Sequence, residues 1–85
     1  MNDSKPGMRE LIELLVRALV EDPSAVSVEE TVDDNDAVVL GVRVAEDDLG
    51  RVIGRNGRVA NAIRTVARAA AVREERRVTV EILED

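Results

Sequence analysis

Two glycines separated by two residues, in the run Gly54-Arg55-Asn56-Gly57, lie between a short apolar turn and a segment with helical periodicity. Glycine has no Cβ, so its backbone adopts positive φ angles and can be approached closely by another group. Arg55 and Arg58 place positive charge at the same point. The sequence therefore predicts a tight interhelical loop that lets a phosphate chain come close to the backbone.

Other interpretations of this glycine spacing require different surroundings. Asn56-Gly57 is a strong hairpin signal, but residues 59–72 lack the period-two alternation that a hairpin strand needs. A dinucleotide-binding fingerprint has glycines spaced G-x-G-x-x-G directly after a strand, whereas the spacing here is G-x-x-x-G-x-x-G after a turn. A purely structural turn between two helices stays open as the alternative to a phosphate clamp.

Length and composition limit the chemistry that the chain can perform. Its 85 residues make one domain, and they include no cysteine and no histidine. Disulfides, thiolate metal sites and the commonest general base are therefore excluded. The remaining acid–base candidates are carboxylates, which crowd into turns and strand ends where solvent keeps them ionised. We predict no catalytic residue, no metal site, no cofactor and no enzyme activity.

No apolar run approaches the length of a membrane span, and the N-terminal residues do not resemble a signal peptide. We therefore expect a cytoplasmic protein without a membrane partner. Residues 1–7 are predicted to be a flexible N-terminus, and residues 8–83 a single domain.

Charge is unevenly distributed along the chain. With 12 basic and 18 acidic residues the net charge is −6, which would argue against a nucleic-acid partner if it were evenly spread. Residues 49–73, however, contain six arginines and no acidic residue, so the other sixty residues, with six basic and 18 acidic, carry −12. Arg51, Arg55 and Arg58 cluster at the glycine loop. Arg64 and Arg68 are interpreted as the solvated back of the following helix.

Hydrophobic periodicity predicts the order helix, strand, strand, short helix, helix, strand. The first helix carries one apolar stripe, formed by Met8, Leu11, Ile12, Leu15 and Leu19. The helix at 59–72 has Val59, Ile63, Val66 and Ala70 on one stripe, opposite Asn61, Arg64, Thr65 and Arg68. Alternating valines predict strands at about 26–32, 38–44 and 78–82. Three helices on one face of a three-stranded sheet give a two-layer α+β fold.

The glycine loop and this α-β-β-α-α-β order resemble the type II KH domain, the form common in bacteria, from about Met8 to Leu83. Residues 50–66, Gly-Arg-Val-Ile-Gly-Arg-Asn-Gly-Arg-Val-Ala-Asn-Ala-Ile-Arg-Thr-Val, are most similar to the small stand-alone bacterial KH proteins of the KhpA (YlqC) family. The resemblance implies binding of short single-stranded RNA by a GXXG loop, which clamps the backbone of about four nucleotides. An RNA chaperone or post-transcriptional regulator is the implied role.

The resemblance also assigns roles to individual residues. The two glycines would permit the backbone approach, Arg55 and Asn56 would contact phosphates, and Ile53 and Val59 would wall an apolar groove for bases. Core packing is the alternative role for the apolar residues, and it is favoured for Ile63. The implied RNA-binding residues are Gly54, Arg55, Asn56, Gly57, Arg58, Arg51, Ile53 and Val59.

The chain contains no Phe, Tyr or Trp. RRM, OB-fold and cold-shock domains stack bases on aromatic rings, so these classes of RNA-binding domain are excluded. Without stacking, the affinity of one domain should be modest, and useful binding would draw on avidity.

A protein-interaction module is the alternative function. The family resemblance implies a homodimer, or a heterodimer with a larger Jag-type KH protein, and the acidic surface would also suit a basic partner or the ribosome. An intact GXXG loop favours RNA, because a pure scaffold does not need it.

Overall fold

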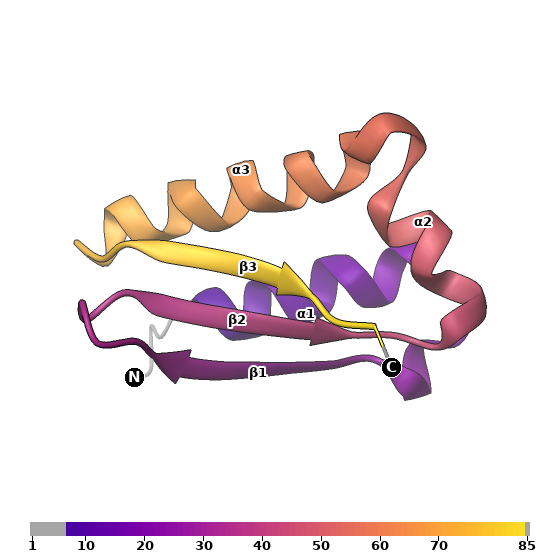
Figure 1. Ribbon diagram of the computed structural model, residues 1–85, viewed down its shortest axis with the longest axis horizontal. Coiled ribbons are helices and arrows are strands. Elements are labelled where there is room, and N and C mark those ends of the chain that lie inside the picture. Colours follow the sequence, from indigo (N-terminus) through magenta and orange to yellow (C-terminus); the bar gives the residue numbers. More distant parts are fainter. Residues whose placement is uncertain (1–6, 85) are drawn as a thin grey trace, which may run out of the picture.

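The computed structural model describes residues 7–84, which form two layers, a sheet and a layer of helices (Figure 1). The elements in chain order are α1 (Met8–Leu19), η1 (Pro23–Ala25), β1 (Ser27–Val32), β2 (Val38–Arg43), η2 (Glu46–Asp48), α2 (Leu49–Ile53), η3 (Arg55–Gly57), α3 (Arg58–Arg73) and β3 (Val78–Ile82), where η marks a 3-10 turn. The predicted α-β-β-α-α-β order is confirmed. The flexible N-terminus predicted for residues 1–7 falls, apart from Gly7, outside the described residues.

The three strands are ordered β1-β2-β3, with β1 antiparallel and β3 parallel to the central strand β2. In this register Leu40 of β2 lies opposite Glu30 of β1 and Val80 of β3. Residues paired across strands share a face of the sheet. The face with Leu40 is the one that α1 and α3 cover, and the core lies between these layers (Figure 1).

The core is aliphatic throughout its described part. Its largest fully buried side chains are Ile12 of α1, Leu40 of β2 and Ile63 of α3. Valines and alanines fill the remaining space, with Met8 at the start of α1. None of the helices within residues 7–84 has the length and hydrophobicity needed to cross a membrane.

The buried face of α3 differs from the predicted stripe. Three alanines and one isoleucine form it, namely Ala60, Ile63, Ala67 and Ala71. Val66, which was predicted to lie in the stripe, is 37% exposed. The small alanine side chains let a helix approach its neighbours closely, so packing turns the alanine side of α3 inward and leaves Val66 on the flank.

The parallel connection from β2 to β3 runs through η2, α2, η3 and α3. It places the glycine loop at one end of the molecule, beyond the end of β2, while the hairpin between β1 and β2 lies at the other end (Figure 1). The glycine loop and this hairpin therefore lie at opposite ends of α3, the longest described helix.

One buried carboxylate fastens α2 to the segment that follows α1. Asp48 is 2% exposed, and its oxygens accept hydrogen bonds from the backbone N–H groups of Glu21 at 3.0 Å and Asp22 at 3.1 Å. The Nε of Arg51 donates a third bond at 3.2 Å. The expectation that carboxylates stay in solvated turns is wrong for Asp48, because these donors compensate for its burial.

These donors also set the acidity of Asp48. The Glu21 N–H hydrogen bond is the largest influence and lowers the pKa of the carboxyl group, and the Asp22 N–H and the Arg51 guanidinium act in the same direction. Burial acts against them by raising the pKa, but the pKa remains below its ordinary value. Asp48 is therefore held ionised inside the protein.

We expect Asp48→Asn to lower the Tm at neutral pH, because the amide cannot replace a carboxylate that accepts from three donors. Asp47→Asn, one residue earlier and exposed, is the matched control and should melt like the parent. The folded-state pKa is depressed, so the stabilisation is complete above the unfolded pKa of about 4 and is lost as the pH falls through the folded pKa. The difference in Tm between parent and variant should therefore shrink below about pH 4. A difference that stays constant on acidification would contradict this role.

Candidate nucleic-acid interface

The glycine loop has an unusual backbone conformation. Gly54 has φ 75° and ψ 172°, Asn56 has φ 58° and ψ 26°, and Gly57 has φ 73° and ψ 14°. The first combination is accessible almost only to glycine, whereas the left-handed region of the other two also admits asparagine. The sequence Gly-x-Asn-Gly thus matches the conformation at each position where φ is positive.

The two glycines meet different surroundings. A Cβ placed on Gly54 would lie 2.4 Å from Cγ2 and 2.8 Å from the backbone nitrogen of Val59, whereas a Cβ on Gly57 would have no other heavy atom within 4 Å. Gly54 therefore allows the first turn of α3 to pack against the loop, and Gly57 leaves open space above it. Both glycines were predicted to have the same role, and the packing role of Gly54 was missed.

The N-terminus of α3 faces this loop. Gly57 is its N-cap residue, and no side chain in the described part of the protein caps it. The N–H of Arg58 bonds to the carbonyl of Arg55. The first N–H groups of a helix lack intrahelical acceptors and carry the positive end of the helix dipole, so the position is favourable for an anion.

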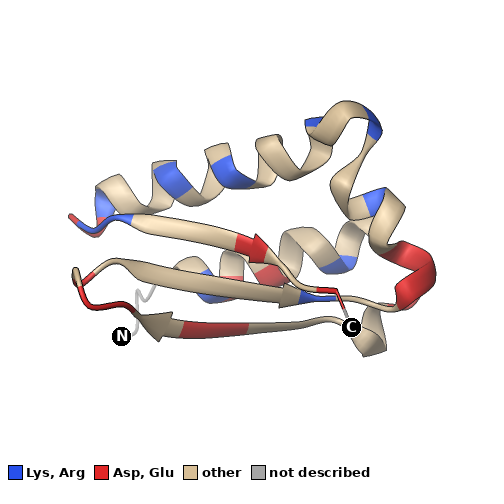
Figure 2. Cartoon of the chain, in the orientation of Figure 1, with Lys and Arg blue, Asp and Glu red and all other residues tan. Residues whose placement is uncertain are grey.

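The three arginines near the loop are not equivalent. Basic residues occur on both sides of the bend between α2 and α3 (Figure 2). Arg55 and Arg58 are exposed, and neither has an ion-pair or hydrogen-bond partner for its side chain among residues 7–84. Arg51 instead places Nη2 2.9 Å from Oε1 of Glu21 and Nε 3.2 Å from Oδ1 of Asp48. Two of the three guanidinium groups are thus unengaged.

The predicted apolar residues divide in a similar way. Ile63 is 1% exposed and belongs to the core, as the alternative role proposed. Ile53 and Val59 are half-buried, one at the end of α2 and the other in the first turn of α3. The structure therefore brings the eight predicted RNA-binding residues to the same end of the molecule, with an apolar side chain on each flank of the loop.

Arg64 lies in the cleft between α3 and β3, where it was not predicted. Arg64 was predicted to lie on the solvated back of the helix, but it is half-buried, with Nε 3.3 Å from the carbonyl oxygen of Val80. A small cavity of about 100 Å³ lies beside it, lined by Arg64, Arg68, Val78, Thr79 and Val80. The orientation follows from the inward turn of the alanines, which brings Arg64 to the β3 side of α3. The run of alanines in the sequence was the only signal for it.

Fold and loop together define a KH-type domain. A family model described as the KH domain of KhpA/KhpB matches residues 9–82, and the chain belongs to this family. Proteins named RNA-binding protein KhpA from Clostridium acetobutylicum, Caldanaerobacter subterraneus and Clostridium perfringens are 47%, 45% and 43% identical to it. Each alignment covers 89% of this chain and 100% of the relative.

Solved structures with the same fold are more distant. A crystal structure of Era in complex with MgGDPNP and nucleotides 1506–1542 of 16S ribosomal RNA superposes with a TM-score of 0.62 at 21% identity. The match covers 88% of this chain but only 28% of the Era chain. This likeness shows a shared fold for the domain.

Alanine substitutions should separate the roles of the two glycines. Gly54→Ala combines a backbone conformation that costs a side chain about 1–3 kcal/mol with a clash against Val59, so we expect a large loss of stability in urea denaturation. Gly57→Ala meets open space and should cost about 1–2 kcal/mol for its left-handed backbone alone. Equal losses from the two variants would show that the contact with Val59 does not matter.

Proposed function

We propose that the protein binds single-stranded RNA at the GXXG loop and catalyses no reaction. The observation that carries the proposal is the meeting, at one exposed loop, of an uncapped helix N-terminus, two unpaired arginines and the open space above Gly57. The relatives named RNA-binding protein KhpA support it.

In the proposed complex, a backbone phosphate lies over Gly57 and accepts hydrogen bonds from N–H groups of the first turn of α3 other than that of Arg58, which bonds to Arg55. Arg55 and Arg58 bind the same or the adjacent phosphate, because a guanidinium group can donate two parallel hydrogen bonds to its oxygens. The amide of Asn56 supplies a further neutral donor. Ile53 and Val59 line the apolar surface on which the bases lie.

Arg51 remains among the proposed site residues, but its contribution differs. Its guanidinium group binds Asp48 and Glu21, and so it holds α2 in place at the start of the loop. We therefore expect its substitution to affect RNA binding mainly through the position of the loop.

The absence of aromatic residues sets the character of the interaction. Phosphate contacts carry no sequence information, and stacking, which is worth about 1–3 kcal/mol per base, is missing. Binding should therefore be sequence-tolerant and modest in affinity. These properties suit an RNA chaperone or post-transcriptional regulator in the cytoplasm, acting as a homodimer or with a larger Jag-type KH protein to gain avidity.

The double variant Arg55→Asp, Asn56→Asp tests the proposal. It should abolish binding of short single-stranded RNA while leaving the fold intact, because exposed loop substitutions usually change stability by at most about 0.5 kcal/mol. In the parent, NMR amide shifts on adding RNA should concentrate in residues 51–63, and they should vanish in the variant. Thermal melting checks the fold.

A control with the same change in net charge is Arg73→Asp, Ser24→Asp, since both positions are exposed and lie outside α2, the loop and the first turn of α3. It should bind RNA almost like the parent. If the loop variant melts like the parent and still binds RNA equally well, the loop is only an interhelical turn. The protein-interaction alternative, including association with the ribosome, would then become the leading one.

Salt dependence measures how many phosphates the site neutralises. If the loop contacts about 2 to 4 phosphates, log K should fall against log salt with a slope of about −1.4 to −2.8, at roughly 0.7 per phosphate for a single strand. Fluorescence anisotropy at several salt concentrations gives this slope. A slope near zero would mean that the arginines do not contact the RNA backbone.

A further inference from the structure

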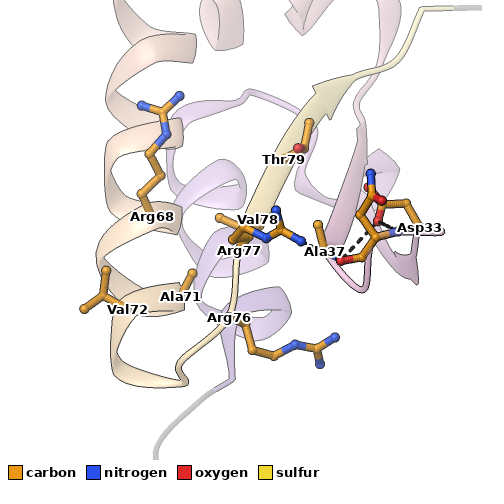
Figure 3. A pocket seen from close by; sticks show the side chains of 10 residues that line it. Asp33, Ala37, Arg68, Ala71, Val72, Arg76, Arg77, Val78 and Thr79 are labelled. Carbon is orange, nitrogen blue, oxygen red and sulfur yellow. Dashed lines mark hydrogen bonds between the residues drawn. The ribbon is translucent and has the colours of Figure 1, made fainter.

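A second basic cleft lies at the end of α3 that is far from the glycine loop (Figure 3). Its volume is about 550 Å³, and it lies between the last turns of α3, the start of β3 and the hairpin joining β1 to β2. The polar side chains around it belong to Arg68, Arg76, Arg77, Thr79, Asp33 and Asn35. Three arginines thus meet one aspartate.

Hydrogen bonds fix the shape of this cleft. Nη2 of Arg77 donates to the carbonyl oxygen of Asn35 at 2.6 Å, which ties the start of β3 to the hairpin. Oδ1 of Asp33 accepts from the backbone N–H groups of Asn35 at 2.8 Å and Ala37 at 3.0 Å. The single carboxylate that lines the cleft is therefore engaged within the hairpin turn.

The basic groups retain unused donors. Arg68 is exposed, and its side chain has no partner among residues 7–84. Arg77 uses one nitrogen for Asn35 and keeps the rest of its guanidinium group, and Thr79 on β3 also lines the cleft (Figure 3). Arg76 lies 3.7 Å from Oδ1 of Asp36 and is partly neutralised. Arg68 on α3 and Arg77 at the start of β3 therefore offer donors from the two elements that border the cleft.

Acidic residues lie in the two segments that border the cleft, the hairpin between β1 and β2 and the turn after α3. Asp34 and Asp36 lie in the hairpin, and Glu74 and Glu75 follow α3, all of them exposed. A polyanion that runs along α3 to the cleft meets these acidic residues beyond it. Arginines recur along α3 between the loop and the cleft (Figure 2).

We propose that this cleft is a second phosphate-binding site, which takes a phosphate of the same RNA strand that the glycine loop binds. The inference rests on the proposed function. Arg58 at the loop and Arg68 at the cleft are ten residues apart on α3, about 15 Å along the helix axis. Arg64, between them, lines the α3–β3 cleft. The bound strand therefore runs along α3, and its footprint exceeds the loop's about four nucleotides.

The phosphate in the cleft has two sources of the same chemistry. It is either an internal phosphodiester of a longer strand or the terminal phosphomonoester of a short one. Each presents tetrahedral oxygens that guanidinium groups bind bidentately. The acidic residues beyond the cleft would repel a strand that continued past it, so they favour a strand end in the cleft. A terminal phosphate carries a charge of about −1.5 to −2.

Three RNA ligands separate these sources. The first has about four nucleotides and hydroxyl ends, the second is the same RNA with a 5′ or 3′ terminal phosphate, and the third has about eight nucleotides and hydroxyl ends. We expect the second or the third to bind severalfold more tightly than the first, with a salt slope steeper by about 0.7. A gain from the terminal phosphate assigns a strand end, and a gain from length alone assigns an internal phosphodiester.

Arginine variants connect either gain to the cleft. Arg68→Gln should remove the gain without affecting the fold, because its side chain has no hydrogen bond or ion pair to lose among residues 7–84, and Arg77→Gln should remove it as well. Arg73→Gln is the matched control, since it changes the same charge on the same helix outside the cleft, and it should keep the gain. Melting curves of Arg77→Gln test whether the variant keeps the stability of the parent.

The second site is overturned if neither ligand gains affinity, or if the gain survives both cleft variants. In that case the first RNA still binds at the loop and the proposed function stands. If the parent binds none of the three RNAs, the proposed function and the second site both fail.

Discussion

The carboxylate of Asp48 connects α2 to the segment after α1, and this connection determines the position of the glycine loop. It accepts two backbone N–H groups from the segment after α1 and one guanidinium N–H from α2. α2 has only five residues, too few for a helix to be stable by itself. Its orientation therefore depends on tertiary contacts, and the charged ones come from Asp48 and from the Arg51–Glu21 ion pair. The loop that follows α2 starts from a point fixed to the rest of the fold.

Local features of the sequence predicted most of the fold. The third strand was predicted at 78–82, where it is found, and the long helix at 59–72 is Arg58–Arg73. Periodicity suffices for such elements, because each buries one face. The loop was equally predictable, since its backbone conformation requires glycine at Gly54 whatever the distant surroundings.

The errors concern residues whose partners are remote in sequence. Asp48 binds N–H groups 26 and 27 residues away, and Arg64 donates to a carbonyl 16 residues away. A helical wheel shows neither, and it also assigned Val66 to the core because valine is more apolar than alanine. The rotation of α3 is decided by how closely the helix approaches the strands. That approach depends on the alanine side chains, whose small size a hydrophobicity pattern does not weigh.

A negative net charge is compatible with binding a polyanion because the fold separates the charges. Acidic residues gather in η2 and in the hairpin between β1 and β2, while α3 carries arginines along its length (Figure 2). Exposed charges farther apart than about 8–10 Å are largely screened at physiological salt, so the local arginines dominate what a phosphate meets at the loop. A chain without aromatic residues has to obtain its affinity from such contacts. In the proposed complex, each additional phosphate bound along α3 adds affinity without adding sequence preference, because every nucleotide offers the same phosphate.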